Sequence, residues 1–417
     1  MRKIYTLAMY ALVPVILIRL LWKSRRSSAY CQRISERFAL GRAPTAVDVW
    51  VHAVSLGEVV AVTPLVERML ANNLRVMITT MTPTGSQQVQ TRFKSKVSHQ
   101  YIPYDLPWCL RRFFKQIQPR MGIIMETELW PNMLQQAVFA KIPLVLVNAR
   151  LSDQAFVHYQ KMHYFFAPLL SLFEWIGTQS DMDTQRYQAL GASSSKASMM
   201  GNMKFDLSIL SAKTDTLDQL KVAWGAHRPV WIAASTHEDE ESQLLAQLSR
   251  IKAAIPEMVL LIAPRRPERF QTVHTLVKQQ GWKVGLRSQL ETIQEDCDVI
   301  VLDSMGELMG FYRLSDYAFV GGSLVPIGGH NVLEPIALQV PVFCGPYMQN
   351  SKSICEDLSQ KKALQPCASA EEFADKLIAL HQNVEQREQQ ISSATAVLEA
   401  NRGTVDRYWE RIAQDLG

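Results

Sequence analysis

Two series of short apolar runs, each followed by a segment with helical spacing, constrain the fold of this chain more than any other feature. The runs of the first series cover 49–54, 75–80, 99–103, 121–125, 143–148 and 175–178, and those of the second cover 230–234, 258–263, 299–302, 317–320 and 342–344. Strands that alternate with helices form parallel sheets with crossover helices. At 417 residues the chain is also too long for one ordinary core. We therefore expect two Rossmann-like, doubly wound α/β domains.

The expected domains are separated by a polar linker. We assign 29–206 to the first domain, 207–225 to the linker, 226–395 to the second domain and 396–417 to a C-terminal helix. Such a bilobed chain would have its domains facing each other across a cleft, and clefts at domain interfaces favour small ligands.

Residues 1–28 have the pattern of an uncleaved membrane anchor. Residues 4–22 are mostly apolar and would form a helix roughly 28 Å long, close to the thickness of a bilayer core. Pro14 and Arg19 weaken a spanning helix, so a helix lying in the interface stays open. Cationic residues follow the apolar run, which places the body of the protein on the cytoplasmic face and suits an anionic lipid surface. A cleaved signal peptide is the weaker alternative.

Composition excludes several classes of function. The net charge of +5 is not concentrated in a basic stripe with interleaved aromatic residues, so no nucleic-acid partner is expected. The six cysteines show no C-x-x-C spacing, which favours reduced thiols over disulfides or a zinc site. The sequence also lacks P-loop, H-E-x-x-H and G-x-S-x-G motifs.

Acidic residues follow two strands of the first domain. Glu58 comes just after the first strand, and Glu126 and Glu128 follow the fourth. Ligands of parallel sheets bind at the carboxyl ends of strands. A carboxylate there can accept a proton from a hydroxyl group. Alternatively, Glu58 is a first-turn acid whose pKa the helix dipole lowers.

A glycine-rich stretch, 321–335, links a strand of the second domain to a helix start. Paired glycines allow close approach of a ligand, and helix N-termini favour anions, so the stretch predicts a phosphate cradle. Asn331 and Glu334 on the first turn could bind a ribose or base, although an ordinary turn with capping residues fits equally well.

Neighbouring strand ends add polar groups to the same expected site. Arg265 can neutralise a phosphate, and 305–307 offers backbone N–H groups. Thr236 and Glu240 match a capping box, which is a structural role. Two D-x-D patterns, at Asp181 and Asp296, fit a helix cap and a strand start better than a metal site.

These residues together resemble the 3-deoxy-D-manno-octulosonic acid (Kdo) transferases of lipopolysaccharide synthesis. The motifs that carry the resemblance run in order along nearly the whole chain: HAVSLGE at 52–58, ETELWPN at 126–132, GNMKFD at 201–206, STHEDEE at 235–241, PRRPERF at 264–270 and GGSLVPIGGHNVLEP at 321–335.

The resemblance implies a GT-B fold and inverting transfer of Kdo from CMP-Kdo to a lipid A precursor (lipid IVA) at the inner membrane, without a cofactor or metal. It also implies that Glu58 is the general base and that Glu128 and Lys204 stabilise the transition state. The implied CMP site comprises Pro264, Arg265, Met305, Gly306, Glu307, Asn331, Val332, Leu333 and Glu334.

The chain departs from the family pattern at Arg266, Ile336 and Tyr347, which puts details of the nucleotide contacts in doubt. Two alternatives stay open: another GT-B enzyme that uses a UDP-sugar, such as a lipid A disaccharide synthase or an epimerase, and a membrane-tethered nucleotide-binding module without turnover. The number of Kdo residues transferred, the acceptor's acylation, use of a modified Kdo and the oligomeric state cannot be deduced from the sequence.

Overall fold

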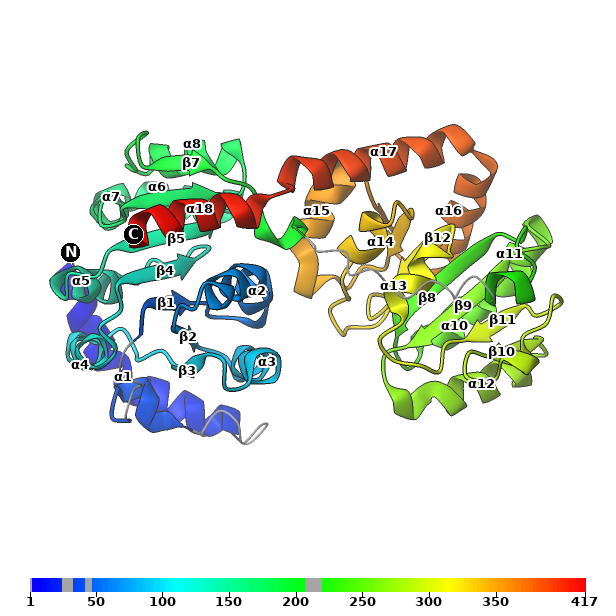
Figure 1. The fold of residues 1–417 in the computed structure, drawn as a ribbon, viewed down its shortest axis with the longest axis horizontal. Helices are drawn as coiled ribbons and strands as arrows, with labels where there is room; N and C mark the ends of the chain where they lie inside the picture. Colours follow the sequence, from blue (N-terminus) through cyan, green and yellow to red (C-terminus); the bar gives the residue numbers. More distant parts are fainter. Residues whose placement is uncertain (1, 25–32, 42–46, 207–219) are drawn as a thin grey trace. The chain divides into compact units, whose positions relative to one another are not determined.

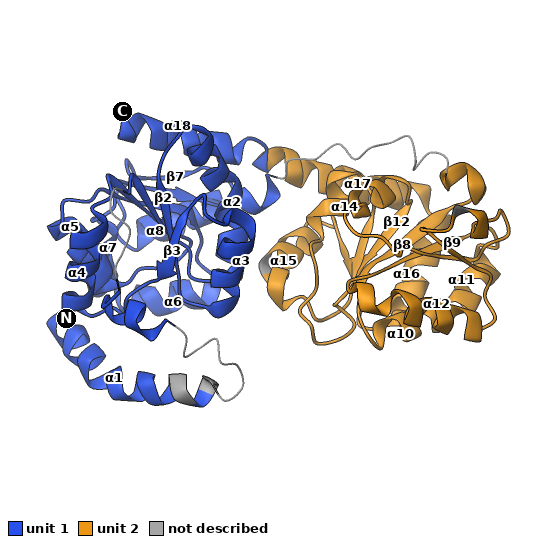
Figure 2. Cartoon of the chain, turned by 60° about the horizontal axis from the view of Figure 1, so that its bottom comes forward, with its two compact units in different colours: residues 1–206, 401–417 blue, residues 207–400 orange. Residues whose placement is uncertain are grey.

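The computed structural model describes residues 2–24, 33–41, 47–206 and 220–417, which form two compact units (Figure 2). Unit 1 comprises 1–206 and 401–417, and unit 2 comprises 207–400. Most of the expected linker therefore lies outside the described residues. The cleft expected between the domains stays a prediction.

Unit 1 is built on a parallel sheet with the strand order β3-β2-β1-β4-β5-β6-β7 (Figure 1). Its strands are β1 (Val49–His52), β2 (Val76–Thr80), β3 (Ser98–Tyr101), β4 (Met121–Met125), β5 (Leu144–Ala149), β6 (Trp175–Thr178) and β7 (Ala197–Met199). The chain leaves β1 in one direction to β2 and later returns to its other side with β4. The chain order therefore reverses between the neighbouring strands β1 and β4. This is the topological switch point, and ligands of open α/β sheets bind at the carboxyl ends of the strands there.

Helices cover both faces of this sheet. They are α1 (Arg2–Ser24), α2 (Leu56–Ala71), α3 (Pro83–Phe93), α4 (Pro107–Ile117), α5 (Pro131–Phe139), α6 (Asp153–Lys161), α7 (His163–Leu170), α8 (Asp181–Ala189) and α18 (Thr404–Leu416), with 3-10 turns η2 (Ile34–Phe38) and η3 (Met203–Phe205). Every residue of β1, β2, β4, β5 and β6 is buried, as expected for a sheet covered on both sides.

Helix α18 belongs to unit 1 although the chain reaches it only after unit 2. Its residues Val405, Tyr408, Ile412 and Leu416 join the core that α2 covers. The Asp206 carboxylate accepts the backbone N–H groups of Gly403 and Val405 and so satisfies free donors at the start of α18. Figure 1 shows α18 lying beside this sheet.

Unit 2 repeats the architecture with the strand order β10-β11-β9-β8-β12-β13-β14, again parallel. Its strands are β8 (Val230–Thr236), β9 (Val259–Pro264), β10 (Val284–Leu286), β11 (Val299–Val301), β12 (Tyr317–Val320), β13 (Val342–Cys344) and β14 (Gln365–Pro366). Its switch point lies between β8 and β12.

The helices of unit 2 are α10 (Glu240–Ala246), α11 (Leu248–Ala254), α12 (Phe270–Gln279), α13 (Leu308–Arg313), α14 (Leu333–Ala337), α15 (Lys352–Gln360), α16 (Ala370–Gln382) and α17 (Val384–Asn401). Short 3-10 turns are η4 (Pro267–Arg269), η5 (Leu290–Thr292) and η6 (Gln349–Ser351). The two expected parallel-sheet α/β domains are therefore confirmed.

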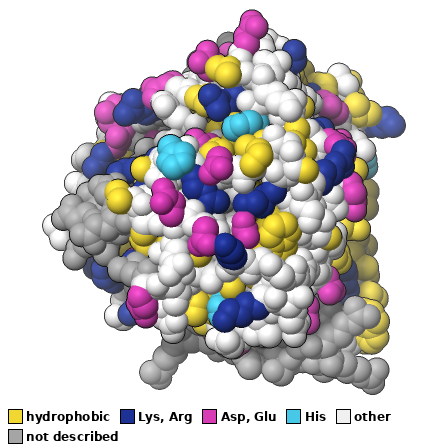
Figure 3. Space-filling model, turned by 90° about the vertical axis from the view of Figure 1, so that its right-hand side faces the viewer, with side chains coloured by type: hydrophobic (Ala, Val, Ile, Leu, Met, Phe, Trp, Pro, Cys, Tyr) yellow, Lys and Arg dark blue, Asp and Glu magenta, His cyan; other side chains and the backbone are white. Residues whose placement is uncertain are grey.

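Figure 3 shows one face of the molecule, on which basic and acidic side chains are interspersed with scattered apolar ones. On this face the Lys and Arg side chains do not gather into a stripe. The five cysteines in the described residues are buried free thiols, as expected.

The spanning interpretation of the N-terminal anchor gains no support. None of the helices in the part of the chain that the structure describes is both long and apolar enough to cross a bilayer. Helix α1 instead docks on unit 1, where Met9, Val13 and Ile16 pack against the core and the Thr6 hydroxyl donates to Oδ1 of Asn132 at 2.8 Å.

Candidate functional site

Glu58 lies on the first turn of α2, at the switch point of unit 1. Ser55 caps the helix, and its Oγ accepts the Glu58 N–H at 3.4 Å. The Glu58 carboxyl group accepts the Ser55 hydroxyl at 2.7 Å and the Val54 N–H at 2.8 Å. This reciprocal arrangement is a variant of the capping box, in which Glu58 accepts the N–H of the residue before the N-cap, and it fixes the carboxyl group beyond the end of β1.

A turn after β4 brings two more acids to the same edge of the sheet. Glu126 adopts a φ of 51°, a left-handed conformation that is costly for a residue with a side chain and that clusters at functional sites. The Glu128 carboxylate accepts the Trp130 indole N–H at 2.7 Å. Because β4 pairs with β1, the structure brings together the three glutamates of the sequence prediction.

Lys204 completes this cluster from η3. Its Nζ lies 2.7 Å from Oε1 of Glu126, and both side chains are about four-fifths buried. The lysine thus pairs with Glu126, while Glu128 is held by Trp130. Neither sequence pattern nor spacing indicates this choice of partner.

The pKa of Glu58 differs from the sequence expectation. The helix dipole was expected to lower it, but burial, followed by repulsion from Glu126 and Glu128, raises it to about 8. The hydrogen bonds from Ser55 and Val54 oppose this shift only partly. A carboxyl group with a pKa in this range can act as a general acid or base near neutral pH.

The turn that carries Lys204 is fixed by Asn148 and α18. Oδ1 of Asn148 accepts the Met203 N–H at 3.0 Å, and Asn148 itself has a φ of 53° at an irregularity in β5. The Tyr408 hydroxyl accepts the Asn148 N–H at 3.0 Å and donates to the Gly177 carbonyl at 2.9 Å. The C-terminal helix therefore supports the position of Lys204.

Unit 2 has a cavity of about 360 Å³ at the carboxyl ends of its strands. Seven residues of the expected CMP site line it: Pro264, Arg265, Met305, Gly306, Glu307, Asn331 and Glu334. Val332 and Leu333 are buried below it and do not line it. The sequence analysis missed the other nine lining residues, of which four are polar: Ser235, Ser304, Tyr312 and His330. Of these four, His330 could have been predicted from the sequence, because it directly precedes Asn331, which was assigned to the site.

Several polar groups of this cavity are already paired. The Glu307 carboxylate accepts Arg287 at 2.9 Å, and the Glu334 carboxylate accepts the Asn331 amide at 3.2 Å. Within the described residues Arg265 forms no ion pair, and its side chain is exposed at the cavity wall. Arg265 acts electrostatically on the Glu334 carboxyl group but forms no ion pair with it, so its guanidinium can bind an anionic ligand.

The first half of the glycine-rich stretch does not hold a ligand phosphate. The N–H groups of Gly322, Ser323 and Leu324 donate to the buried Glu240 carboxylate at 2.7 to 3.0 Å. Glu240 also accepts the His237 N–H at 3.2 Å. In the first half of 321–335, the backbone N–H groups expected to bind phosphate therefore bind Glu240 instead. Of this stretch, only the later residues His330, Asn331 and Glu334 line the cavity.

The capping-box interpretation of Thr236 and Glu240 is also wrong, because the Glu240 carboxylate accepts N–H groups of the glycine-rich stretch. The Thr236 hydroxyl donates to Glu241 at 3.2 Å, and the residue that precedes α10 is Asp239, with no side-chain cap. Glu240 connects α10 to the glycine-rich loop.

The two D-x-D patterns have structural roles. Ser180, and not Asp181, caps α8, and Asp183 accepts the Leu151 N–H. Asp298 pairs with Lys252 just before β11. The described residues contain no group of three His, Cys, Asp or Glu side chains placed to hold a metal ion.

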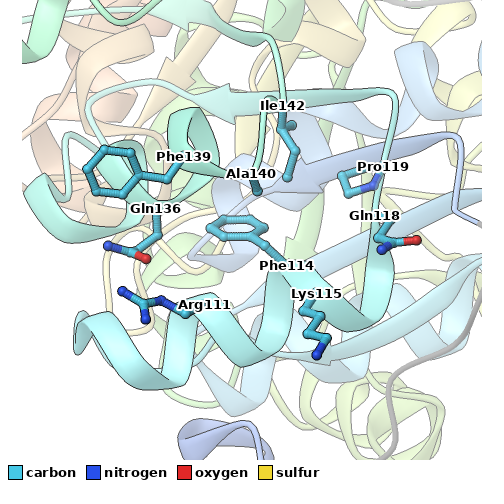
Figure 4. A pocket seen from close by; sticks show the side chains of 9 residues that line it. All are labelled: Arg111, Phe114, Lys115, Gln118, Pro119, Gln136, Phe139, Ala140 and Ile142. Atoms are coloured by element: carbon cyan, nitrogen blue, oxygen red, sulfur yellow. The ribbon is translucent and has the colours of Figure 1, made fainter.

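A second cavity, of about 610 Å³, lies between α4 and α5 of unit 1 (Figure 4). Its wall combines the cations Arg111 and Lys115, one turn apart on α4, with apolar side chains that include Phe114 and Phe139. The start of α1 adjoins it, because the Arg2 guanidinium lies 6.0 Å from the centre of the Phe139 ring.

Comparisons with known proteins agree with the resemblance. The model of the 3-deoxy-D-manno-octulosonic-acid transferase (kdotransferase) family matches residues 32–207. The 3-deoxy-D-manno-octulosonic acid transferase of Haemophilus influenzae is 38% identical, over 99% of this chain and 98% of its own. The chain belongs to the Kdo transferase family. It is accordingly a glycosyltransferase.

A solved structure agrees with the observed architecture. The glycotransferase of kitacinnamycin is 14% identical with a TM-score of 0.53, over 90% of this chain and all of its own, which shows a shared two-domain fold of the GT-B kind. The C-terminal CMP-Kdo binding domain of WaaA from Acinetobacter baumannii is 36% identical with a TM-score of 0.42, over 44% of this chain and 95% of its own.

Proposed function

We propose that this Kdo transferase moves Kdo from CMP-Kdo to a lipid A precursor (lipid IVA), with inversion at the anomeric carbon and release of CMP. The observation that carries the proposal is the carboxyl cluster at the switch point of unit 1. It holds Glu58 with a pKa of about 8 and with Oε1 already accepting a hydroxyl, that of Ser55, at 2.7 Å. A carboxylate of this pKa can take a proton from a sugar hydroxyl.

The proposed reaction is a direct displacement. The acceptor hydroxyl oxygen attacks the anomeric carbon of Kdo, the bond from that carbon to the CMP phosphate oxygen breaks, and Glu58 takes the hydroxyl proton. Glu128 and Lys204 stabilise the transition state. The ion pair between Lys204 and Glu126 supports this role, because it holds a positive charge beside carboxylates that would otherwise repel an ionised Glu58.

The donor lies in the cavity of unit 2 in this proposal. Arg265 neutralises the CMP phosphate, Asn331 and Glu334 bind the ribose or base, and 305–307 supplies backbone groups. Val332 and Leu333, which are buried, act by fixing the start of α14. Among the described residues that line the cavity, Arg265 is the one cation, and one cation suits a single phosphate better than the diphosphate of a UDP-sugar.

We further propose that transfer needs no metal or other cofactor. The leaving phosphate is then stabilised by protein groups alone. The test is the rate of transfer after dialysis against EDTA, which should equal that of the untreated enzyme and should not rise when magnesium is added back.

Contact with the cytoplasmic face of the inner membrane is supported by the outer face of α1. Ile4, Leu7, Val15, Ile18 and Trp22 recur at helical spacing and are 55 to 72% exposed. An apolar stripe next to cations suits a helix that lies in an anionic lipid interface. The Arg2 guanidinium, at the start of α1, lies 6.0 Å from the centre of the Phe139 ring, which lines a cavity together with Arg111 and Lys115. Replacing Ile4, Leu7 and Ile18 by Asp should release the protein from anionic vesicles, whereas the exposed Val222 replaced in the same way should not.

The test of the proposed function is incubation with CMP-Kdo and lipid IVA, read by mass spectrometry. We expect addition of Kdo to the acceptor with formation of CMP, and no transfer from UDP-sugars. Transfer from a UDP-sugar would favour the alternative glycosyltransferase. CMP binding without any product would favour a binding module.

A further inference from the structure

Two histidines face each other at the switch point of unit 2. His237 follows β8 and His330 follows β12, and their Nε2 atoms lie 2.9 Å apart with the rings parallel within 3°. Gly322 passes beside them so closely that a Cβ on it would lie 3.1 Å from His330. His330 also lines the cavity that contains Arg265. The pair is therefore a built feature of the donor site, and the displacement proposed above does not use it.

The distance between the rings restricts how many protons the pair can carry. A bond between two Nε2 atoms needs one Nε2–H donor and one Nε2 lone pair. One extra proton on Nδ1 of the donor ring leaves this bond intact and makes it charge-assisted, hence stronger. A second extra proton would set two N–H groups against each other. The pair thus has two intact states, neutral and singly positive.

The surroundings favour the neutral state when the cavity holds no anion. Charged side chains near the pair come from three segments: Arg265, Arg266 and Arg269 after β9, Glu238, Glu240 and Glu241 after β8, and Glu334 on α14. Burial, followed by the arginines, lowers the pKa of His237. Burial, followed by His237 and Arg265, lowers the pKa of His330 to about 4.

The nearby carboxylates do not offset the arginines fully. Glu240 is occupied by four backbone N–H groups, and Glu241 pairs with Arg269 at 3.1 Å. Glu238 approaches Arg269 only to 3.7 Å from an exposed position. Arg265 acts electrostatically on the Glu334 carboxyl group without forming an ion pair with it, and Arg266 has no ion-pair partner among the residues described, so positive charge remains beside the histidines.

We propose that the His237–His330 pair takes up a proton when the nucleotide phosphate binds beside it and thereby stabilises the leaving group. This rests on the proposed donor site. Breaking the bond between Kdo and CMP sends its electron pair to the phosphate oxygen, which changes the phosphate from one negative charge to two. The acceptor proton goes to Glu58. The proton on the histidine pair comes from solvent, and it lies where the new negative charge develops.

The experiment is calorimetric titration of CMP into the full-length enzyme at pH 6.5 in two buffers of different ionisation enthalpy. The difference in apparent enthalpy gives the number of protons taken up. His237→Phe removes the Nε2 partner, His330→Asn removes the cavity imidazole, and His227→Gln is the matched control at an exposed histidine. Because CMP titrates equally in all samples, only differences between proteins are compared.

We expect the wild type and His227→Gln to take up about half a proton more than either pair variant, because a nearby anion raises a histidine pKa by about one to three units. The variants should bind CMP about tenfold more weakly. In the wild type, saturation with CMP should also move the Cε1–H resonance of one of the two histidines, the donor ring of the pair, to its imidazolium position.

Equal proton uptake in all four proteins, or unshifted resonances of both His237 and His330 in CMP-saturated wild type, would overturn the proposal while leaving CMP binding intact. Failure of the wild type to bind CMP would instead remove the donor site itself. The resonances are measured in the wild type, so the proposal can be overturned even if both pair variants fail to fold.

Discussion

Nζ of Lys204 lies 2.7 Å from Oε1 of Glu126. Among the described residues, Lys204 is the only cation that contacts the cluster of Glu58, Glu126 and Glu128. It pairs with Glu126, the one glutamate of the three to which the sequence analysis gave no role. The lysine limits the negative potential that Glu126 exerts on Glu58. Glu126 is thus the link between Lys204 and the proposed base.

Replacing Lys204 by Ala should slow transfer about tenfold to a hundredfold and raise the pH at which activity appears. With the ammonium gone, the charge on Glu126 repels an ionised Glu58 without compensation. The measurement is kcat/KM against pH. Lys96→Ala, at an exposed lysine of the same unit, should keep the wild-type profile. An unshifted profile for Lys204→Ala would show that the lysine does not act on Glu58.

Activity of the wild type should rise with pH through about 8 and level off above it. Glu58 acts as a base only when ionised, and a group of pKa about 8 is about one-tenth ionised at pH 7. A kcat/KM profile that is already flat at pH 6 would contradict this.

The same shift links Glu58 to stability. Its pKa in the folded protein lies above the ordinary value of 4.5, so the folded state binds the proton more tightly. The protonated Glu58 therefore adds to the free energy of unfolding. This contribution is complete below about pH 4.5 and is lost as pH rises through about 8. The difference in melting temperature between Glu58→Gln and the wild type should therefore shift in favour of the variant when the pH is raised from 6 to 9.

Arg265→Ala should weaken CMP binding about tenfold or more, because a charge-assisted contact contributes about 1.5 to 3 kcal/mol. Calorimetry gives the Kd directly. Arg313→Ala, at an exposed arginine at the end of α13, is the control. Unchanged CMP affinity would remove Arg265 from the site.

Glu240→Gln should lower the melting temperature of unit 2 and weaken CMP binding. The amide nitrogen of Gln would face backbone N–H groups that now donate to a carboxylate, and an unsatisfied buried group costs about 1 to 3 kcal/mol. Glu238→Gln, at an exposed neighbour, should change neither quantity. Wild-type melting and affinity in Glu240→Gln would show that the loop does not depend on this carboxylate.

The fold was predictable from sequence where strands are buried. The limits of β4, β6, β12 and β13 agree with the apolar runs, because residues covered on both faces must be apolar. Strands β7, β10 and β14 were missed. They are two or three residues long and lie at or near sheet edges, where solvent accepts polar residues such as Ser198 or Gln365.

The site was predictable to the level of strand ends. Glu58, Glu126 and Glu128 could be placed at one edge because parallel strands share a direction. The raised pKa of Glu58 could not be foreseen, since it depends on burial and on distances between strands. The role of Glu240 was also hidden, because its partners lie more than 80 positions away in the chain.

The most direct test of the account is the single-turnover rate of Kdo transfer by Glu58→Gln at saturating CMP-Kdo and lipid IVA. Gln keeps the shape of Glu but cannot take the hydroxyl proton. The account predicts a rate lower by about a hundredfold or more, with CMP affinity unchanged. A rate near that of the wild type would contradict the assignment of Glu58 as the base.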